Sequence, residues 1–298
     1  MTITAIIDCY NSAEFLAEAI KSVLSQTRQP DDFIIVDDGS QDESVAIAQE
    51  MTSGIEWARV IVKENGGQLS CVSKGIVEAK GELLALLDGD DYWLEHHLEK
   101  AEEQFKKHKK LSLYFSSCTA CGESEHYMNR SCAPGLIGQT QVVTACGASY
   151  IGGLNSSLVA KAESLKPYLP LPHEIERDWV VNADNIIVWL TSLYGGFKYA
   201  EYKPGVRYRL HPENNFKKLR GYPERIHRKA ATARFFEYCR KTYSIPANFA
   251  LILSHEYRAH PTKTKALRKD YLKALSKSSY QLTPLQKVIT WSRIFLAR

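Results

Sequence analysis

Three carboxylates stand together in residues 83–93, which read LLALLDGDDYW with Asp88, Asp90 and Asp91 around one glycine. Carboxylates this close repel one another and raise one another's pKa unless a cation lies among them. An Asp-x-Asp turn after a buried strand suits a hard divalent cation with oxygen ligands, such as magnesium or manganese. The alternative is a polar turn that caps the strand, with Asp88 and Asp91 accepting hydrogen bonds from backbone amides.

Four short apolar runs in the first 90 residues are typical of buried strands, and helical patterns separate them. The runs are ITAIID, FIIVDD, ARVIVKE and ELLALLD. This alternation predicts an α/β fold with a mainly parallel sheet and helices on both faces. Ligands bind such sheets beyond the carboxyl ends of the strands, so the polar residues at these ends should meet in one crevice. They are Asp8, Asp37, Asp38, Asn65 and Asp88.

The pattern weakens after residue 110. LSLYFSS and QVVTACGASYI are expected to be strands, DNIIVWLTSLYGG a helix ended by glycines, and FKYAEYKPGVRYRLH extended. At the start of the chain, Asn11 and Glu14 have the spacing of a capping box for the first helix.

The charge of the chain changes sign near Asn215. Residues 1–214 carry 19 basic and 30 acidic side chains, a net charge of −11, whereas residues 215–298 carry 19 and 4, a net charge of +15. We therefore expect a catalytic domain over residues 1–215 and a basic helical region over residues 216–298. The basic region has no nucleic-acid recognition motif, and we expect no nucleic-acid partner.

Composition places the chain among ordinary globular proteins, with 44% hydrophobic and 24% charged residues in 298. No apolar run approaches the roughly 20 residues of a membrane span. The N-terminal MTITAIIDCYN is typical of a strand rather than a signal peptide, and seven scattered cysteines favour free thiols in the cytoplasm. Cys118-x-x-Cys121, with His126 and Cys132 nearby, is a weak zinc hypothesis because it lacks a second paired ligand set.

Several motifs in order give the chain a close likeness to one family. The stretches IIDCYN, LSQT, IIVDDGSQDES, ENGGQLSCVSKGIVEAKGE, LLDGDDYW, NADNIIVWL and YRLHPENN cover roughly residues 3–215. Together they resemble the inverting glycosyltransferases of family 2, of the bacterial surface-glycan type. The resemblance implies a GT-A (Rossmann-like) fold, a divalent Mn or Mg ion, and transfer of a hexosyl or N-acetylhexosaminyl group from a nucleotide-sugar.

The resemblance also implies donor-binding positions. Asp8, Tyr10 and Asp38 would hold the base, which is most often uracil, although simple turn capping is an alternative for Asp38. Asn65 and Ser73 would line the nucleotide pocket. Asp88 would lie on the ribose and phosphate side, and Asp91 would be structural.

The remaining implied positions concern the metal and the reaction. Asp90 would be the metal ligand, His211 a metal or phosphate ligand, and Arg209 a contact to the diphosphate, which a planar guanidinium suits. Asp184 would be the general base, at a helix start where the dipole favours a carboxylate. Asp178, six residues earlier, is the rival acid.

The C-terminal residues TPLQKVITWSRIFLAR predict an amphipathic helix with a capping box between Thr283 and Gln286 and proline at its first position. Basic residues opposite an apolar face fit a helix that lies in a membrane interface. The alternative is an internal brace or a contact with a second copy, and the brace would bury three side chains of the apolar face. They are Leu285, Val288 and Phe295.

The function we expect is transfer of a sugar to a hydroxyl of a lipid-linked or polymeric glycan, in polysaccharide biosynthesis at the inner membrane face. Two other classes remain open. A nucleotidyltransferase is also α/β and metal-dependent, but it usually needs a glycine-rich phosphate loop that this chain does not show. A non-catalytic glycan-binding or membrane-binding module of the same fold is opposed by the intact Asp88, Asp90 and Asp184.

Overall fold

A ten-stranded sheet forms the centre of the molecule. The computed structural model describes residues 1–128, 134–212, 214, 222–243, 249–278 and 282–297. The strand order is β3-β2-β1-β4-β9-β6-β10-β5, with β7 paired to β6 and β8 to β10. The strands are β1 Ile3–Cys9, β2 Asp32–Asp37, β3 Ala58–Val62, β4 Leu83–Asp88, β5 Tyr92–Trp93, β6 Leu111–Gly122, β7 His126–Met128, β8 Gly135–Ile137, β9 Leu158–Lys161 and β10 Phe197–Leu210.

The first four strands form the parallel half of the sheet. β1 lies between β2 and β4, and all three run in the same direction, with Ile6 opposite Ile34 and Leu86. Asp8 and Asp88 are register partners at the carboxyl end of this half. In the other half β6 and β10 are parallel, whereas β9 enters between β4 and β6 antiparallel to both. The predicted α/β fold with a mostly parallel sheet is confirmed.

Helices cover both faces because side chains alternate along each strand. Ile3, Ala5 and Ile7 of β1 face one buried cluster, and Ile6 faces the other. Helices α1, α2 and α4 contribute to the first cluster, and α3, α5 and α7 to the second. Their bounds are α1 Ala13–Leu24, α2 Ser44–Thr52, α3 Gln68–Glu78, α4 His97–Lys107, α5 Gln141–Gly147, α6 His173–Glu176 and α7 Ala183–Tyr194.

Two local expectations are wrong. Residues 141–147 form α5 instead of a strand, because the carboxylate of Glu256 accepts hydrogen bonds from the amides of Val142 and Val143, at 2.7 and 3.0 Å, and so caps a helix. The capping box at Asn11 is also absent: Asn11 is left-handed at φ 49°, and its Oδ1 accepts from the Gln41 amide instead. In both places a contact distant in sequence decides the local structure.

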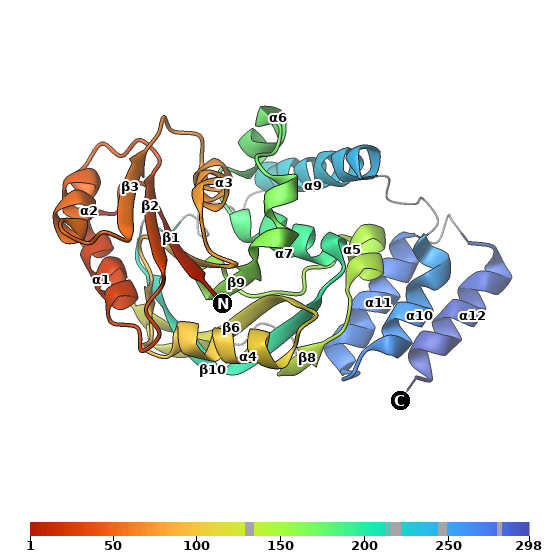
Figure 1. Ribbon diagram of the computed structural model, residues 1–298. Coiled ribbons are helices and arrows are strands. Elements are labelled where there is room, and N and C mark those ends of the chain that lie inside the picture. The colour runs from red at the N-terminus through yellow and green to blue at the C-terminus, as the bar shows by residue number, and fades with distance from the viewer. Residues whose placement is uncertain (129–133, 213, 215–221, 244–248, 279–281, 298) are drawn as a thin grey trace.

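The C-terminal region is helical, as predicted. Its helices are α9 Tyr222–Thr242, α10 Leu253–Ala259, α11 Lys265–Lys277 and α12 Pro284–Phe295. α10, α11 and α12 lie side by side at one end of the molecule next to α5, whereas α9 lies apart from them (Figure 1). No helix among the described residues is long and apolar enough to cross a membrane. Asn215, the predicted boundary, lies outside those residues, and the division at 215/216 stays a prediction.

Candidate active site

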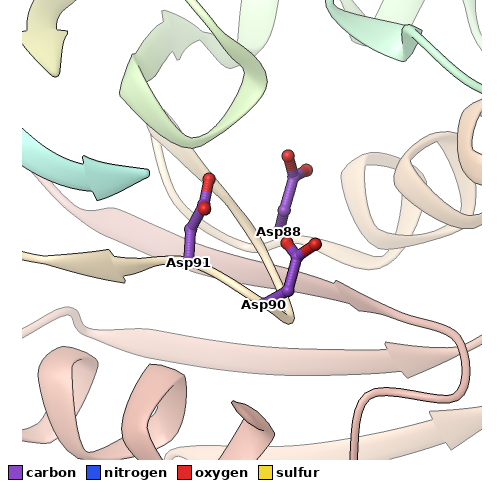
Figure 2. Close-up of side chains that lie close together, drawn as sticks. All are labelled: Asp88, Asp90 and Asp91. Atoms are coloured by element: carbon purple, nitrogen blue, oxygen red, sulfur yellow. The ribbon is translucent and has the colours of Figure 1, made fainter. Parts of the chain in front are cut away.

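The carboxylate turn joins β4 to β5 at the edge of the sheet. Oxygens of Asp88, Asp90 and Asp91 all lie within 4.8 Å of one another (Figure 2). Asp91 is buried, and its two oxygens accept from the Ser156 hydroxyl at 2.6 Å and from the Arg209 amide at 2.9 Å. Asp91 therefore holds the turn against the rest of the fold, which leaves Asp88 and Asp90 facing the cavity.

Burial and like charge act together on these groups. Burial, followed by the charge of Asp90, raises the pKa of Asp88 to about 7. The pKa of Asp8 is raised well above its ordinary value by burial and then by Asp88. A cation among these oxygens would relieve the repulsion, and a set of hard oxygen donors fits magnesium or manganese. The residues present thus fit the ion that the resemblance implies.

Two amide side chains organise the carboxylates. Asn155 Nδ2 donates to Asp8 Oδ1 at 3.0 Å and to Asp88 Oδ1 at 2.6 Å. Gln68, the first residue of α3, donates from Nε2 to Asp88 Oδ1 at 3.0 Å and accepts at Oε1 from the Ala183 amide at 3.1 Å. No local pattern points to either residue, because their partners Asp8, Asp88 and Ala183 lie 20 to 147 positions away along the chain.

A cavity of about 650 Å³ opens beside this turn. That volume lies within the ~300–1,000 Å³ usual for small-molecule sites. The lining draws on both halves of the sheet edge and includes seven of the predicted site residues. These are Asp8, Tyr10, Asp38, Asn65, Asp88, Asp90 and Asp184.

Asp38 and Asn65 both line this cavity and are joined in a tight turn. Asp38 accepts from Lys63 Nζ at 2.6 Å and from the amides of Gly66 and Gly67 at 3.0 and 2.8 Å. Asn65 Nδ2 donates back to the Asp38 carbonyl at 2.9 Å. By accepting from these backbone amides Asp38 caps the turn, as the alternative interpretation of this residue predicts. Asp38 also lines the cavity.

Ser73 does not reach the cavity, so its placement in the nucleotide pocket is wrong. Its side chain is 1% exposed, whereas Gln68 and Cys71 line the cavity from the same helix. Residues three apart share a helical face, and Ser73 lies about 200° around the helix from Cys71.

Arg209 and His211 lie behind the carboxylate turn rather than among the lining residues. His211 Nε2 is 3.0 Å from Asp90 Oδ2, and its ring lies 4.8 Å from that of Phe15. Arg209 Nε donates to the Asp90 carbonyl at 3.0 Å, and its guanidinium also pairs with Glu18. Both residues thus contact Asp90, from the end of β10 and just beyond it.

Asp184 also lines the cavity, and besides burial its negative charge contributes to the raised pKa of Asp88. It lies in the first turn of α7, is 6% exposed, and accepts at Oδ2 from the Tyr150 hydroxyl at 2.7 Å. The rival acid Asp178 is bound instead by Arg234 of α9, whose Nε and Nη2 lie 2.7 and 2.6 Å from its oxygens. Asp184 lines the cavity and Asp178 does not.

The zinc hypothesis is wrong for the residues that the structure describes. Cys118 and Cys121 both lie on β6, three residues apart, so their side chains point to opposite faces of the sheet. Cys132 lies outside the described residues. Within the described ranges, the carboxylates of Asp88, Asp90 and Asp91 are the group with metal-ligand spacing.

The carboxylate-lined cavity lies at the carboxyl ends of parallel strands, which is where open α/β sheets bind their ligands. The chain belongs to glycosyl transferase family 2, whose sequence profile matches residues 4–153, half of its length. This confirms the predicted class of enzyme family.

Relatives by sequence carry glycosyltransferase names. An uncharacterized glycosyltransferase of Nostoc sp. is 30% identical over 218 residues, which are 72% of this chain and 66% of that protein. The glycosyltransferase GlyG of Streptococcus pneumoniae is 34% identical over 106 residues, 35% of each chain. The chain thus spans between a third and two thirds of the length of these relatives.

Solved structures share the fold. TarS of S. aureus, residues 1–349 in complex with UDP-GlcNAc, matches 99% of this chain and 79% of its own with a TM-score of 0.61 and 15% identity. A mannosyltransferase of Pyrobaculum calidifontis in complex with GDP-Man and Mn²⁺ matches 99% and 80% with a TM-score of 0.54 and 19% identity. At these identities the likeness shows the fold, and it confirms the GT-A prediction.

Proposed function

We propose that this protein transfers a sugar from a nucleoside-diphosphate donor to an acceptor hydroxyl, with inversion at the anomeric carbon. The observation that carries the proposal is the shared cavity, which is lined by Asp88, Asp90 and Asp184 together. Family membership supports sugar transfer over nucleotidyl transfer, and the convergence of these three acids supports an enzyme over a binding module.

The donor lies along the parallel half of the sheet edge in this proposal. Asp8, Tyr10 and Asp38 contact the base, most often uracil, Asn65 lines the nucleotide pocket, and Asp88 contacts the ribose and the phosphate side. The TarS complex with UDP-GlcNAc and the mannosyltransferase complex with GDP-Man support a nucleotide-sugar donor for this fold.

A divalent ion, manganese or magnesium, is held by Asp90 with Asp88 beside it. His211, 3.0 Å from Asp90, orients that carboxylate or joins the ligands, and Arg209 adds positive charge next to it. When bound, the ion offsets the negative charge that builds on the departing diphosphate.

Asp184 acts as the general base. It accepts the proton of the acceptor hydroxyl as that oxygen bonds to the anomeric carbon and the bond to the diphosphate oxygen breaks. A single displacement of this kind inverts the anomeric centre. The hydroxyl of Tyr150 holds one oxygen of Asp184 and so orients the carboxylate.

The acceptor is a hydroxyl on a lipid-linked or polymeric glycan. One relative supports a lipid-borne hydroxyl: the cholesterol galactosyltransferase of Borreliella burgdorferi is 36% identical over 89 residues, 30% of this chain and 25% of that protein.

The test is a panel of nucleotide-sugars incubated with the protein and Mn²⁺. We expect release of the nucleoside diphosphate from one donor class, and loss of release with a chelator. A nucleotidyltransferase would instead release pyrophosphate from a nucleoside triphosphate and a sugar 1-phosphate. Absence of diphosphate release from every donor, with and without glycan acceptors, would contradict the proposal.

A further inference from the structure

Helix α12 turns its apolar face outward. Leu285, Val288 and Leu296 are 69%, 65% and 72% exposed. Its buried residues are Thr290 and Ile294, which pack toward α10 and α11. The brace alternative, in which Leu285, Val288 and Phe295 would be buried, is therefore wrong. The α12 apolar face consists of Leu285, Val288, Ile289, Trp291, Phe295 and Leu296.

The apolar and basic side chains are arranged around α12 as they are in a helix that lies in a membrane interface. At about 100° per residue its six side chains occupy one arc opposite Thr290 and Ile294. Lys287 falls at one border of the arc and Arg293 at the other. At such positions the aliphatic part of a lysine or arginine side chain can pack against apolar surface while its charged end reaches the headgroup phosphates.

The helix is fully formed without a partner on this face. Thr283 and Gln286 make the predicted capping box with proline at the first position. The rings of Trp291 and Phe295 stack at 4.7 Å, and Arg268 Nη2 of α11 donates to the Ala297 carbonyl at 3.0 Å. Docking would thus bury apolar area without the entropic cost of ordering the helix.

Charge selects the kind of partner. α12 has no acidic residue, and residues 215–298 carry 19 basic and 4 acidic side chains. The neighbouring α11 adds exposed lysines at four-residue spacing, at positions 265, 269, 273 and 277. A second copy would bring two such basic regions together, whereas an anionic surface complements them. We propose that the α12 apolar face docks on an anionic lipid surface, with Lys287 and Arg293 at the headgroups.

The test is co-sedimentation of the full chain with vesicles of phosphatidylcholine alone or with about 30 mol% phosphatidylglycerol, whose anionic headgroups attract basic segments. We expect binding to the anionic vesicles and at least tenfold weaker binding of Leu285→Ser/Leu296→Ser and of Lys287→Glu/Arg293→Glu. The matched control Lys107→Glu/Lys109→Glu changes the net charge equally on α4 and the following turn, and it should bind within about twofold of the parent.

Melting curves establish that the variants are folded, which the exposure of the substituted side chains predicts. A parent protein that stays in the supernatant with anionic vesicles overturns the proposal. So does a control that loses binding as strongly as Lys287→Glu/Arg293→Glu, because attraction would then be unspecific. An oligomer that Leu285→Ser/Leu296→Ser dissociates, without vesicle binding by the parent, would assign the face to a second copy. None of these outcomes depends on the transfer reaction.

Discussion

The carboxylates at the end of β4 are buried close together, so their negative charges repel one another. Burial and Asp90 raise the pKa of Asp88 to about 7, and burial with Asp88 raises that of Asp8. Groups kept in such an environment are concentrated at functional sites. Asp90 has 30% of its side chain exposed, whereas Asp91 is buried, and Asp90 is the acid that His211 contacts.

Asp90→Asn should lower turnover about 100-fold or more and remove the metal-dependent part of donor-nucleotide affinity, since a neutral amide is a poor ligand for a hard cation and charge stabilisation at the diphosphate is then lost. Calorimetric titration of the donor nucleotide with and without Mn²⁺ measures the effect. The exposed Glu95→Gln, just beyond the turn, is the control and should keep full affinity. Unchanged metal-dependent affinity in Asp90→Asn would remove Asp90 from the metal site.

Asp184→Asn should reduce transfer by about 100-fold or more and leave donor binding intact, because general-base catalysis commonly contributes 10²–10⁴. Asp178→Asn should instead lower the melting temperature with little effect on turnover, because its carboxylate is bound by Arg234. Rate assays and melting curves on both variants separate the two roles. An inactive Asp178→Asn beside an active Asp184→Asn would reverse the assignment.

Among the elements, helices α3 and α7 are joined directly, through the side chain of Gln68 at the start of α3. The Gln68 amide donates to the Val180 carbonyl at 3.0 Å, while its side chain joins Asp88 to the first turn of α7. Gly67 is left-handed at φ 86°, and a Cβ there would lie 2.6 Å from the Cα of Val180. The close approach therefore requires glycine, and it places Gln68 between Asp88 and the first turn of α7.

Gln68→Met keeps the length of the side chain and removes both hydrogen bonds. We expect kcat/KM to fall about tenfold or more, since a bond to a charged group contributes about 1.5–3 kcal/mol. Gln29→Met, an exposed position far from the cavity, is the control. Steady-state kinetics with varied donor and varied acceptor measure the change, and a Gln68→Met enzyme with parental kinetics would show that the link is only structural.

At the scale of the whole molecule, one buried cluster continues from the sheet into the C-terminal helices. A hydrogen-bond network also joins the residues before α5 to α10 and α11. His260 Nδ1 accepts from the Gly138 amide at 3.0 Å, and His260 Nε2 lies 2.6 Å from the Tyr271 hydroxyl. That hydroxyl donates to Glu256 at 2.6 Å. Glu256 in turn caps α5. The acidic and basic parts of the chain are thus joined by neutral contacts and shared core rather than by their opposite charges alone.

This network predicts a pH dependence of stability. Burial lowers the pKa of His260 to about 4, whereas an unfolded histidine titrates near 6.5. Between these values the unfolded chain binds a proton that the folded chain does not, so stability is lost as the pH falls from about 6.5 toward 4, by up to about 3 kcal/mol.

His260→Asn should be less stable at pH 7.5 but should lose less on acidification, because the titrating group is gone. Denaturant unfolding at pH 7.5, 6 and 5 measures this. The exposed His255→Asn on α10 should keep the parental pH profile. A profile of His260→Asn parallel to that of the parent protein would contradict the role of His260.

Local pattern was sufficient for much of the fold. Apolar runs bounded by turn residues located β1 to β4, the glycines after Tyr194 located the end of α7, and the Thr283 box located the start of α12. These features depend on residues within a few positions of one another, so the sequence carries them directly. The family resemblance pointed to Asp88, Asp90 and Asp184, and all three line the cavity. Asp88 also stands at the end of a parallel strand, where ligands of such sheets bind.

Tertiary structure alone decided the rest. The helix at residues 141–147, the inward roles of Gln68 and Asn155, and the burial of Ser73 depend on partners far along the chain, which no local pattern encodes. The orientation of α12 is the same case: its apolar stripe can be read from the sequence, but burial of Thr290 and Ile294 turned that stripe outward. Periodicity defines which side chains share a face, and packing against neighbouring elements determines which face meets the solvent.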